Sequence, residues 1–169
     1  MPRSLAAQTL EADDAVCERP LDVLFILDVS SSMDSSLSVA QANSTQIIDT
    51  LGTEIPDLRL ALASVVDYPA VSSGDRRDYP WRLDAPLTTN LRDVQQALLR
   101  LQILDGDDPP ESYLRALSEA QDTSQLGWRS ESDRVIVLWG DAPTVIPTRP
   151  RLHSMVHRMI SRSPVYSLN

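Results

Sequence analysis

The residues with the clearest chemistry follow an apolar run near the start of the chain. Asp28, Ser30 and Ser32 stand in the stretch LFILDVSSSMDSS, residues 24–36. All three side chains offer oxygen atoms, which are the ligands that hard cations such as Mg²⁺ prefer. A turn that presents both hydroxyls to a cation would leave a coordination position open for the carboxylate of a ligand. The alternative interpretation is a serine-rich turn held by local bonds between side chains and backbone.

The rest of the chain predicts alternating strands and helices that would position this motif. Short apolar runs predict strands, and apolar residues at helical spacing predict amphipathic helices. The predicted strands are 21–27, 58–66, a short one within 79–88, 134–143 and 164–168. The predicted helices have their apolar residues within 37–51, 91–101, 113–120 and 152–160. This alternation predicts a doubly wound, mostly parallel α/β sheet flanked by helices on both faces.

Some residues carry more specific predictions about the helices. Ile47 belongs to the apolar set of the first helix. Asn90, with Asp93 three residues later, resembles a capping box at the start of the second helix. Gly127 is the expected C-cap of the helical segment before the fourth strand.

Acidic side chains fall where several predicted strands end. Asp28, Asp67 and Asp141 lie at or near the carboxyl ends of three apolar runs. Ligands of open α/β sheets bind beyond this edge. The acidic loop 104–112 precedes a predicted helix and can reach the same edge. We therefore expect these carboxylates to gather there, although a capping role for Asp141 and a solvated loop position for Asp67 are the simpler alternatives.

Composition limits the classes of function. The chain has 169 residues and a net charge of −9. It contains no lysine, so its 15 strongly basic residues are all arginines, and it has two histidines. The acidic balance argues against nonspecific binding to nucleic acid or anionic membranes. No apolar run approaches the roughly 20 residues that cross a bilayer, and residues 1–20 lack the apolar region of a signal peptide. The single Cys17 is either a free thiol or half of a bridge to another chain.

The motif and two later stretches resemble the von Willebrand factor A (vWA) domain. DVSSS matches that family's metal-ion-dependent adhesion site, Asp-x-Ser-x-Ser, directly after the first strand. GDDPPESYLRAL and LGWRSESDRVIVLWGDAP resemble the integrin β-subunit I-like branch and its bacterial relatives. The resemblance implies a Rossmann-like fold and a Mg²⁺ or Mn²⁺ site that binds an acidic residue of a partner protein. The implied metal ligands are Asp28, Ser30, Ser32, Glu111 and Asp141.

The resemblance also implies a second metal site, for Ca²⁺, and a particular domain organisation. Its matching positions are Asp67, Asp108 and Glu111, with a backbone carbonyl near Pro110, while the asparagine expected there falls on Gly106. A third site would need two aspartates where this chain has Ser35 and Ser36, so none is expected. Residues 1–20 show no clear periodicity and are expected to form a flexible lead segment. The resemblance implies that 21–169 is a vWA domain that lacks the family's C-terminal helix, strand and helix.

Two other functions compete with a binding module. A Mg²⁺-dependent phosphohydrolase of the haloacid-dehalogenase type also has an aspartate after its first strand and a late Gly-Asp, here Gly140-Asp141. That class needs a second aspartate where Ser30 stands and a lysine, which this chain lacks. An intracellular complex-assembly vWA component is the other alternative. The compartment stays open, with an extracellular location suggested by the family alone.

Other features have simpler interpretations. Glu111 could act as a first-turn acid that complements a helix dipole. His153 and His157 are four residues apart on a predicted helix, and without a third ligand nearby a solvated helix face is favoured over a metal site. The three tryptophans are expected to pack in the core.

Overall fold

The computed structural model describes residues 19–69, 77–106, 112–141 and 165–167. In this part of the chain, five strands form one sheet in the order β3-β2-β1-β4-β5. The strands are β1 (Leu21–Asp28), β2 (Leu58–Val65), β3 (Arg82–Thr88), β4 (Asp133–Trp139) and β5 (Val165–Ser167).

The sheet is mostly parallel, as predicted. β1 pairs in parallel with β2 and β4, and β4 pairs in parallel with β5. β3 is antiparallel to β2, with irregular register between Leu60 and Ala63. β3 also carries Pro86, which has no N–H to donate, and its place at the edge of this sheet tolerates that loss. The carboxyl ends of β1, β2 and β4 therefore share one edge of the sheet.

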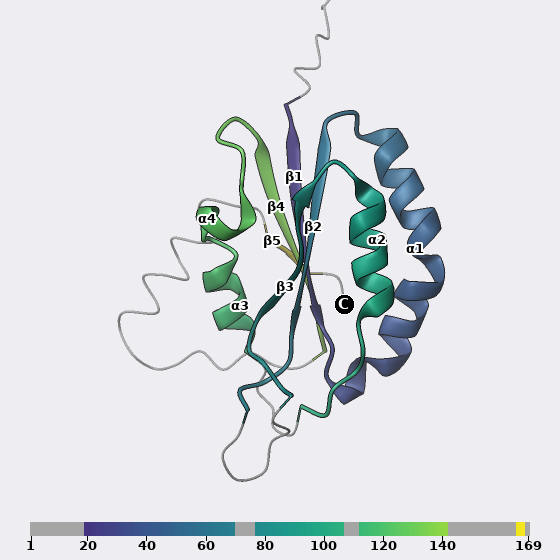
Figure 1. Ribbon diagram of the computed structural model, residues 1–169, viewed down its shortest axis with the longest axis vertical. Coiled ribbons are helices and arrows are strands. Elements are labelled where there is room, and N and C mark those ends of the chain that lie inside the picture. Colours follow the sequence, from purple (N-terminus) through teal and green to yellow (C-terminus); the bar gives the residue numbers. More distant parts are fainter. Residues whose placement is uncertain (1–18, 70–76, 107–111, 142–164, 168–169) are drawn as a thin grey trace, which may run out of the picture.

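Helices cover both faces of the sheet (Figure 1). α1 and α2 lie on one side, and α3 and α4 lie on the other. Their bounds are α1 (Asp34–Glu54), α2 (Leu91–Arg100), α3 (Tyr113–Glu119) and α4 (Thr123–Leu126), and a short 3₁₀ turn, η1 (Ser31–Met33), precedes α1. The structure confirms the predicted doubly wound arrangement.

The core has two layers because alternate residues of each strand point to opposite faces. In β1, Val23 and Leu27 pack on the α1 and α2 side, whereas Leu24 and Ile26 pack on the α3 side. Leu24 and Ile26 are fully buried. Each such side chain stabilises the fold by about 1.5–3 kcal/mol relative to exposure. β1 is thus a central strand packed on both faces, and it holds the start of the motif that follows it in a fixed position.

The tryptophans belong to these layers. Trp128 is buried on the α3 side, and its indole N–H donates to the carbonyl of Ala120 at 2.9 Å. Trp81 packs against the same layer, and Trp139 packs against the opposite one. The expected packing role is confirmed.

Three local predictions differ from the structure. Ile47 is 42% exposed because the inward stripe of α1 is narrow and runs through its neighbour Ile48. Asn90 makes no side-chain cap, since the first turn of α2 is closed by the backbone N–H of Asp93 donating to the Asn90 carbonyl. β4 ends at Trp139, so Asp141 lies two residues beyond the strand.

The expected C-cap at Gly127 is confirmed. Its φ of +72° is in the left-handed region, which favours glycine, and its N–H donates to the Thr123 carbonyl at 3.0 Å. The predicted helix 152–160, with His153 and His157, lies outside the described residues.

Candidate metal centre

The end of β1 turns sharply at the motif. The Asp28 carboxylate accepts the backbone N–H of Ser30 at 2.8 Å, a local bond typical of an Asx turn. The Met33 N–H then donates to the Ser30 carbonyl at 3.0 Å and opens η1. As a result, the hydroxyl oxygens of Ser30 and Ser32 lie 3.2 Å apart.

Asp141 reaches the motif from the neighbouring strand. The Ser32 hydroxyl donates to Asp141 Oδ1 at 2.9 Å, across 109 positions of sequence. This contact follows from the parallel pairing of β1 with β4, which brings the two strand ends to the same edge. The structure therefore brings together Asp28, Ser30, Ser32 and Asp141.

The motif turn is braced on two sides by backbone bonds. The Val29 N–H donates to the Val65 carbonyl of β2 at 3.0 Å, and the Val29 carbonyl accepts the N–H of Leu104 at 2.8 Å. Gly106 has a φ of +56° and lies so close that an added Cβ would be 3.0 Å from Ser30 Cβ. The first residues of the acidic loop thus hold the turn in place, and the glycine allows the close approach.

Tyr113, the first residue of α3, contacts the other oxygen of Asp28. Its phenol donates to Asp28 Oδ2, and both side chains are buried. Helical spacing predicted an inward Tyr113 but not this bond. The available signal was the position of a tyrosine on the first turn after an acidic loop, since a buried phenol requires a polar partner.

The second predicted site is described only in part. Asp67 lies just beyond β2, half-buried, and accepts the N–H of Tyr68 at 2.6 Å and the Ser112 hydroxyl at 3.3 Å. Asp108 and Glu111 lie outside the described residues. At Gly106, the position of the missing asparagine, an added Cβ would also be 3.2 Å from Val66 Cγ1. This backbone leaves little room for a side-chain ligand at that position.

The chemistry of the motif cluster is that of hard oxygen ligands. Asp28 is 1% exposed, whereas Ser32 and Asp141 face solvent. Among the described residues, no arginine forms an ion pair with Asp28 or Asp141. The same residues contain no group of three or more His, Cys, Asp or Glu side chains that could hold a metal. The cluster instead combines two carboxylates with two hydroxyls, a set that suits Mg²⁺ or Mn²⁺.

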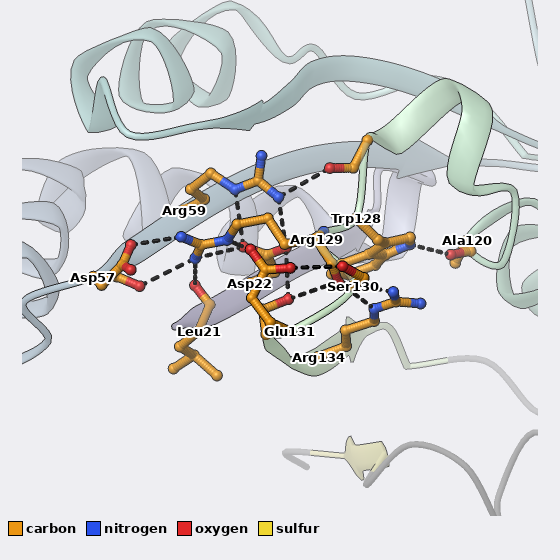
Figure 2. A network of polar contacts seen from close by, with 12 residues as sticks. Leu21, Asp22, Asp57, Arg59, Ala120, Trp128, Arg129, Ser130, Glu131 and Arg134 are labelled. Carbon is orange, nitrogen blue, oxygen red and sulfur yellow. Dashed lines mark hydrogen bonds and ion pairs between the residues drawn. The ribbon is translucent and has the colours of Figure 1, made fainter. Parts of the chain in front are cut away.

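A second buried aspartate lies at the opposite end of β1 (Figure 2). Asp22 is fully buried, and its carboxylate accepts bonds from the guanidinium groups of Arg59 and Arg129 at 2.6–2.9 Å. The backbone N–H of Arg129 and the Ser132 hydroxyl also donate to it, each at 2.9 Å. Burial is the largest single influence and raises the pKa of Asp22, but these bonds together lower the pKa well below its ordinary value.

Comparison with known proteins assigns the chain to a family. Residues 16–162 match the model of the integrin beta chain VWA domain. The chain belongs to this family. vWA domains generally mediate protein–protein interactions rather than catalysis, and the I-like domains of integrin β chains generally depend on divalent cations.

Individual relatives of this vWA domain are distant. Integrin beta-PS of Drosophila melanogaster is 23% identical over an alignment of 137 positions, and the match covers 73% of this chain and 16% of the relative. The chain therefore spans a small part of that protein.

Two solved structures support the vWA fold. They are the vWF domain of the type V pili tip protein Mfa5 from Porphyromonas gingivalis and a structure of three N-terminal domains of the same protein. The first has a TM-score of 0.55 at 19% identity and covers 75% of this chain and 39% of that one. The second has a TM-score of 0.52 at 20% identity and covers 72% and 19%. Within the described part of the vWA domain, no helix is long and apolar enough to cross a bilayer.

Proposed function

We propose that this vWA domain is a protein-binding module of the adhesion type, and not an enzyme, in which a divalent cation binds a carboxylate of the partner. The proposed metal ligands, direct or through water, are Asp28, Ser30, Ser32, Glu111 and Asp141. The proposed ion is Mg²⁺ or Mn²⁺, because the ligands are carboxylate and hydroxyl oxygens.

The observation that carries this proposal is the state of Asp28. A buried carboxylate is costly unless it is paired or hydrogen-bonded. Asp28 is 1% exposed and accepts bonds from the Ser30 N–H and the Tyr113 hydroxyl, both of which are neutral donors. Asp22, by contrast, accepts bonds from two guanidinium groups. A cation beside Ser30 and Ser32 would supply at Asp28 the positive charge that the described residues do not provide.

The residues of the cluster have distinct roles in this proposal. A bound cation would act as the electrophile that attracts the partner's carboxylate. The Ser30 and Ser32 hydroxyls would offer lone pairs, while Ser32 keeps its proton toward Asp141, to which it donates. Asp28 and Asp141 would balance the charge of the ion, and the solvent-facing side of Ser32 and Asp141 would admit the partner.

Two finer parts of the proposal rest on the family alone. We place Ca²⁺ at a second site with Asp67 and Asp108, where the structure describes Asp67 only. We also propose an extracellular location, because integrin beta-PS, a distant relative, is an integrin β chain.

The first test measures stability against metal. A ligand that binds only the folded state stabilises it by about 2.7 kcal/mol at a hundredfold excess over Kd. We expect MgCl₂ or MnCl₂ to raise the melting temperature of the chain relative to EDTA, and Asp28→Asn to abolish this shift. Asp133→Asn, which changes an exposed aspartate at the opposite edge, is the matched control and should keep the shift. No shift in the parent chain at millimolar metal would contradict the proposal.

The second test identifies the chemistry of the partner. A random peptide library is panned on the chain in Mg²⁺ and eluted with EDTA. We expect enrichment of peptides with Asp or Glu, and loss of binding when that residue is changed to Asn or Gln. Enrichment of peptides without an acidic side chain would argue against a carboxylate as the bound group.

A further inference from the structure

We propose that Tyr113 is a positioning residue for the metal site and holds Asp28 in the orientation that the cation requires. The inference rests on the proposed function, because it concerns the same site. It extends that proposal to a side chain on α3 that need not touch the ion.

Two donors from different elements fix the Asp28 carboxylate. The Ser30 N–H of the motif turn donates to Oδ1 at 2.8 Å, and the Tyr113 phenol of α3 donates to Oδ2. Tyr113 is 4% exposed and packs in the α3-side core, so its ring has little freedom. A carboxylate held at both oxygens cannot rotate freely about its Cβ–Cγ bond.

Gly140 provides the space in which this contact forms. It follows the last residue of β4 and precedes Asp141. A Cβ at this position would overlap the phenol oxygen, lie 2.6 Å from Tyr113 Cζ and lie 3.1 Å from Asp28 Cβ. The ends of β1 and β4 and the start of α3 therefore meet at one point, and any larger residue at 140 would displace the phenol.

The phenol of Tyr113 carries no charge, and this is why it can orient Asp28 without balancing its negative charge. A tyrosine hydroxyl donates one bond and adds no positive charge near neutral pH. A guanidinium at this place would orient Asp28 equally well but would cancel the charge that attracts a cation. Tyr113 thus orders the carboxylate and leaves its charge available to the metal.

The test compares two Tyr→Phe variants by calorimetric titration of the full chain with MgCl₂ or MnCl₂. Partners that orient metal ligands typically contribute roughly 10–100-fold to metal affinity. We expect Tyr113→Phe to weaken binding by about 10-fold or more. Tyr79→Phe is the control, because it removes another hydrogen-bonded phenol, the one that meets Ser64 at 2.8 Å, and should leave the affinity unchanged.

A second variant disrupts the contact between Tyr113 and Asp28 without removing the phenol. Gly140→Ala keeps the phenol but displaces it from Asp28, so we expect it to weaken metal binding as well. A cooperative unfolding transition in EDTA establishes that each variant is folded. If Tyr113 had only a structural role, its replacement would change that transition but would leave the metal affinity of the folded chain unchanged.

The outcomes separate this inference from the proposed function. If the parent chain binds neither Mg²⁺ nor Mn²⁺, the proposed metal site is wrong and the role of Tyr113 is overturned with it. If the parent binds metal and folded Tyr113→Phe binds it with equal or higher affinity, the metal site stands and the positioning role is overturned. Weaker binding by Tyr113→Phe alone, with Tyr79→Phe unchanged, supports the inference.

Discussion

Strand β1 carries a buried aspartate at each end, and the two carboxylates are held in different ways. Asp22 is bonded by Arg59, Arg129 and Ser132, so its negative charge is balanced within the fold. Asp28 is bonded by a backbone N–H and a phenol, and no described basic residue pairs with it. Both lie in the same strand, and their exposed fractions are 0% and 1%. The difference therefore lies in the charge of the neighbours and not in burial.

The comparison suggests that the two ends of β1 have different roles. Removing one partner from a buried ion pair leaves an uncompensated charge and is strongly destabilising. A carboxylate with neutral donors does not have that dependence, and it remains able to attract an external cation. We infer that the Asp22 end serves stability and the Asp28 end serves binding.

The largest expected effect is at Asp22. Asp22→Asn should lower the free energy of unfolding by about 3 kcal/mol, because Arg59 and Arg129 would lose the carboxylate that they share. Urea denaturation in EDTA measures this change, with Asp133→Asn, in an exposed pair with Arg19, as the control of small effect. If Asp22→Asn lowers the free energy of unfolding no more than Asp133→Asn does, Asp22 is not a stabilising charge and the proposed difference between the two ends of β1 is wrong.

The next effect is steric. Gly140→Ala should destabilise the chain by about 2 kcal/mol, because overpacking a filled site forces side chains and backbone to move. The affected groups are the phenol of Tyr113 and the Cβ of Asp28. Urea denaturation of the Ala variant and of Gly140→Ala combined with Tyr113→Phe tests this cause. The double variant should lose less than the two single changes added together, since Phe removes one of the colliding atoms.

A smaller effect concerns pH. The pKa of Asp22 is lower in the folded chain than its ordinary value of 3.8, despite burial, because Arg59, Arg129 and Ser132 bond its ionised form. A lowered folded pKa contributes stability above the unfolded pKa, and this stability is lost as pH falls through and below that value. The free energy of unfolding, measured from about pH 6 to about pH 3, should fall more steeply for the parent than for Asp22→Asn. Equal slopes would show that Asp22 does not contribute.

The smallest expected effect is at Asp28 without metal. Asp28→Asn in EDTA should change the free energy of unfolding by less than about 1 kcal/mol. The amide oxygen can accept the Ser30 N–H, the amide NH₂ can donate to the Tyr113 hydroxyl oxygen, and no ion pair is broken. Chemical denaturation beside Asp22→Asn gives a direct contrast between the two ends of β1. A destabilisation as large as that of Asp22→Asn would mean that Asp28 is also a structural charge.

Several features of the chain could be predicted from the sequence because they follow from local pattern or from the rule that parallel strands end at one edge of a sheet. The apolar run 21–27 gives the central strand, and the alternation of strands and helices gives the mostly parallel sheet. Asp28, Ser30 and Ser32 are brought together by one turn, and Asp141 joins them because parallel strands end at the same edge. Gly127 ends α4 because glycine accepts a positive φ.

Other features are decided only when distant elements meet. Arg129 is 107 positions from Asp22, and Tyr113 is 85 positions from Asp28. Spacing within an element predicts which face is inward, but it does not predict which polar atom lies opposite, because that depends on how helices and strands pack. The exposed Ile47 has a similar origin, because the packing of α1 decides which part of its apolar stripe is buried. The missing Asn90 cap is a local exception, since a backbone bond closes the first turn of α2 instead. The sequence by itself therefore determined the oxygen-rich motif and the strand that carries it, whereas tertiary packing decided that Asp22 is paired with arginines and Asp28 is not.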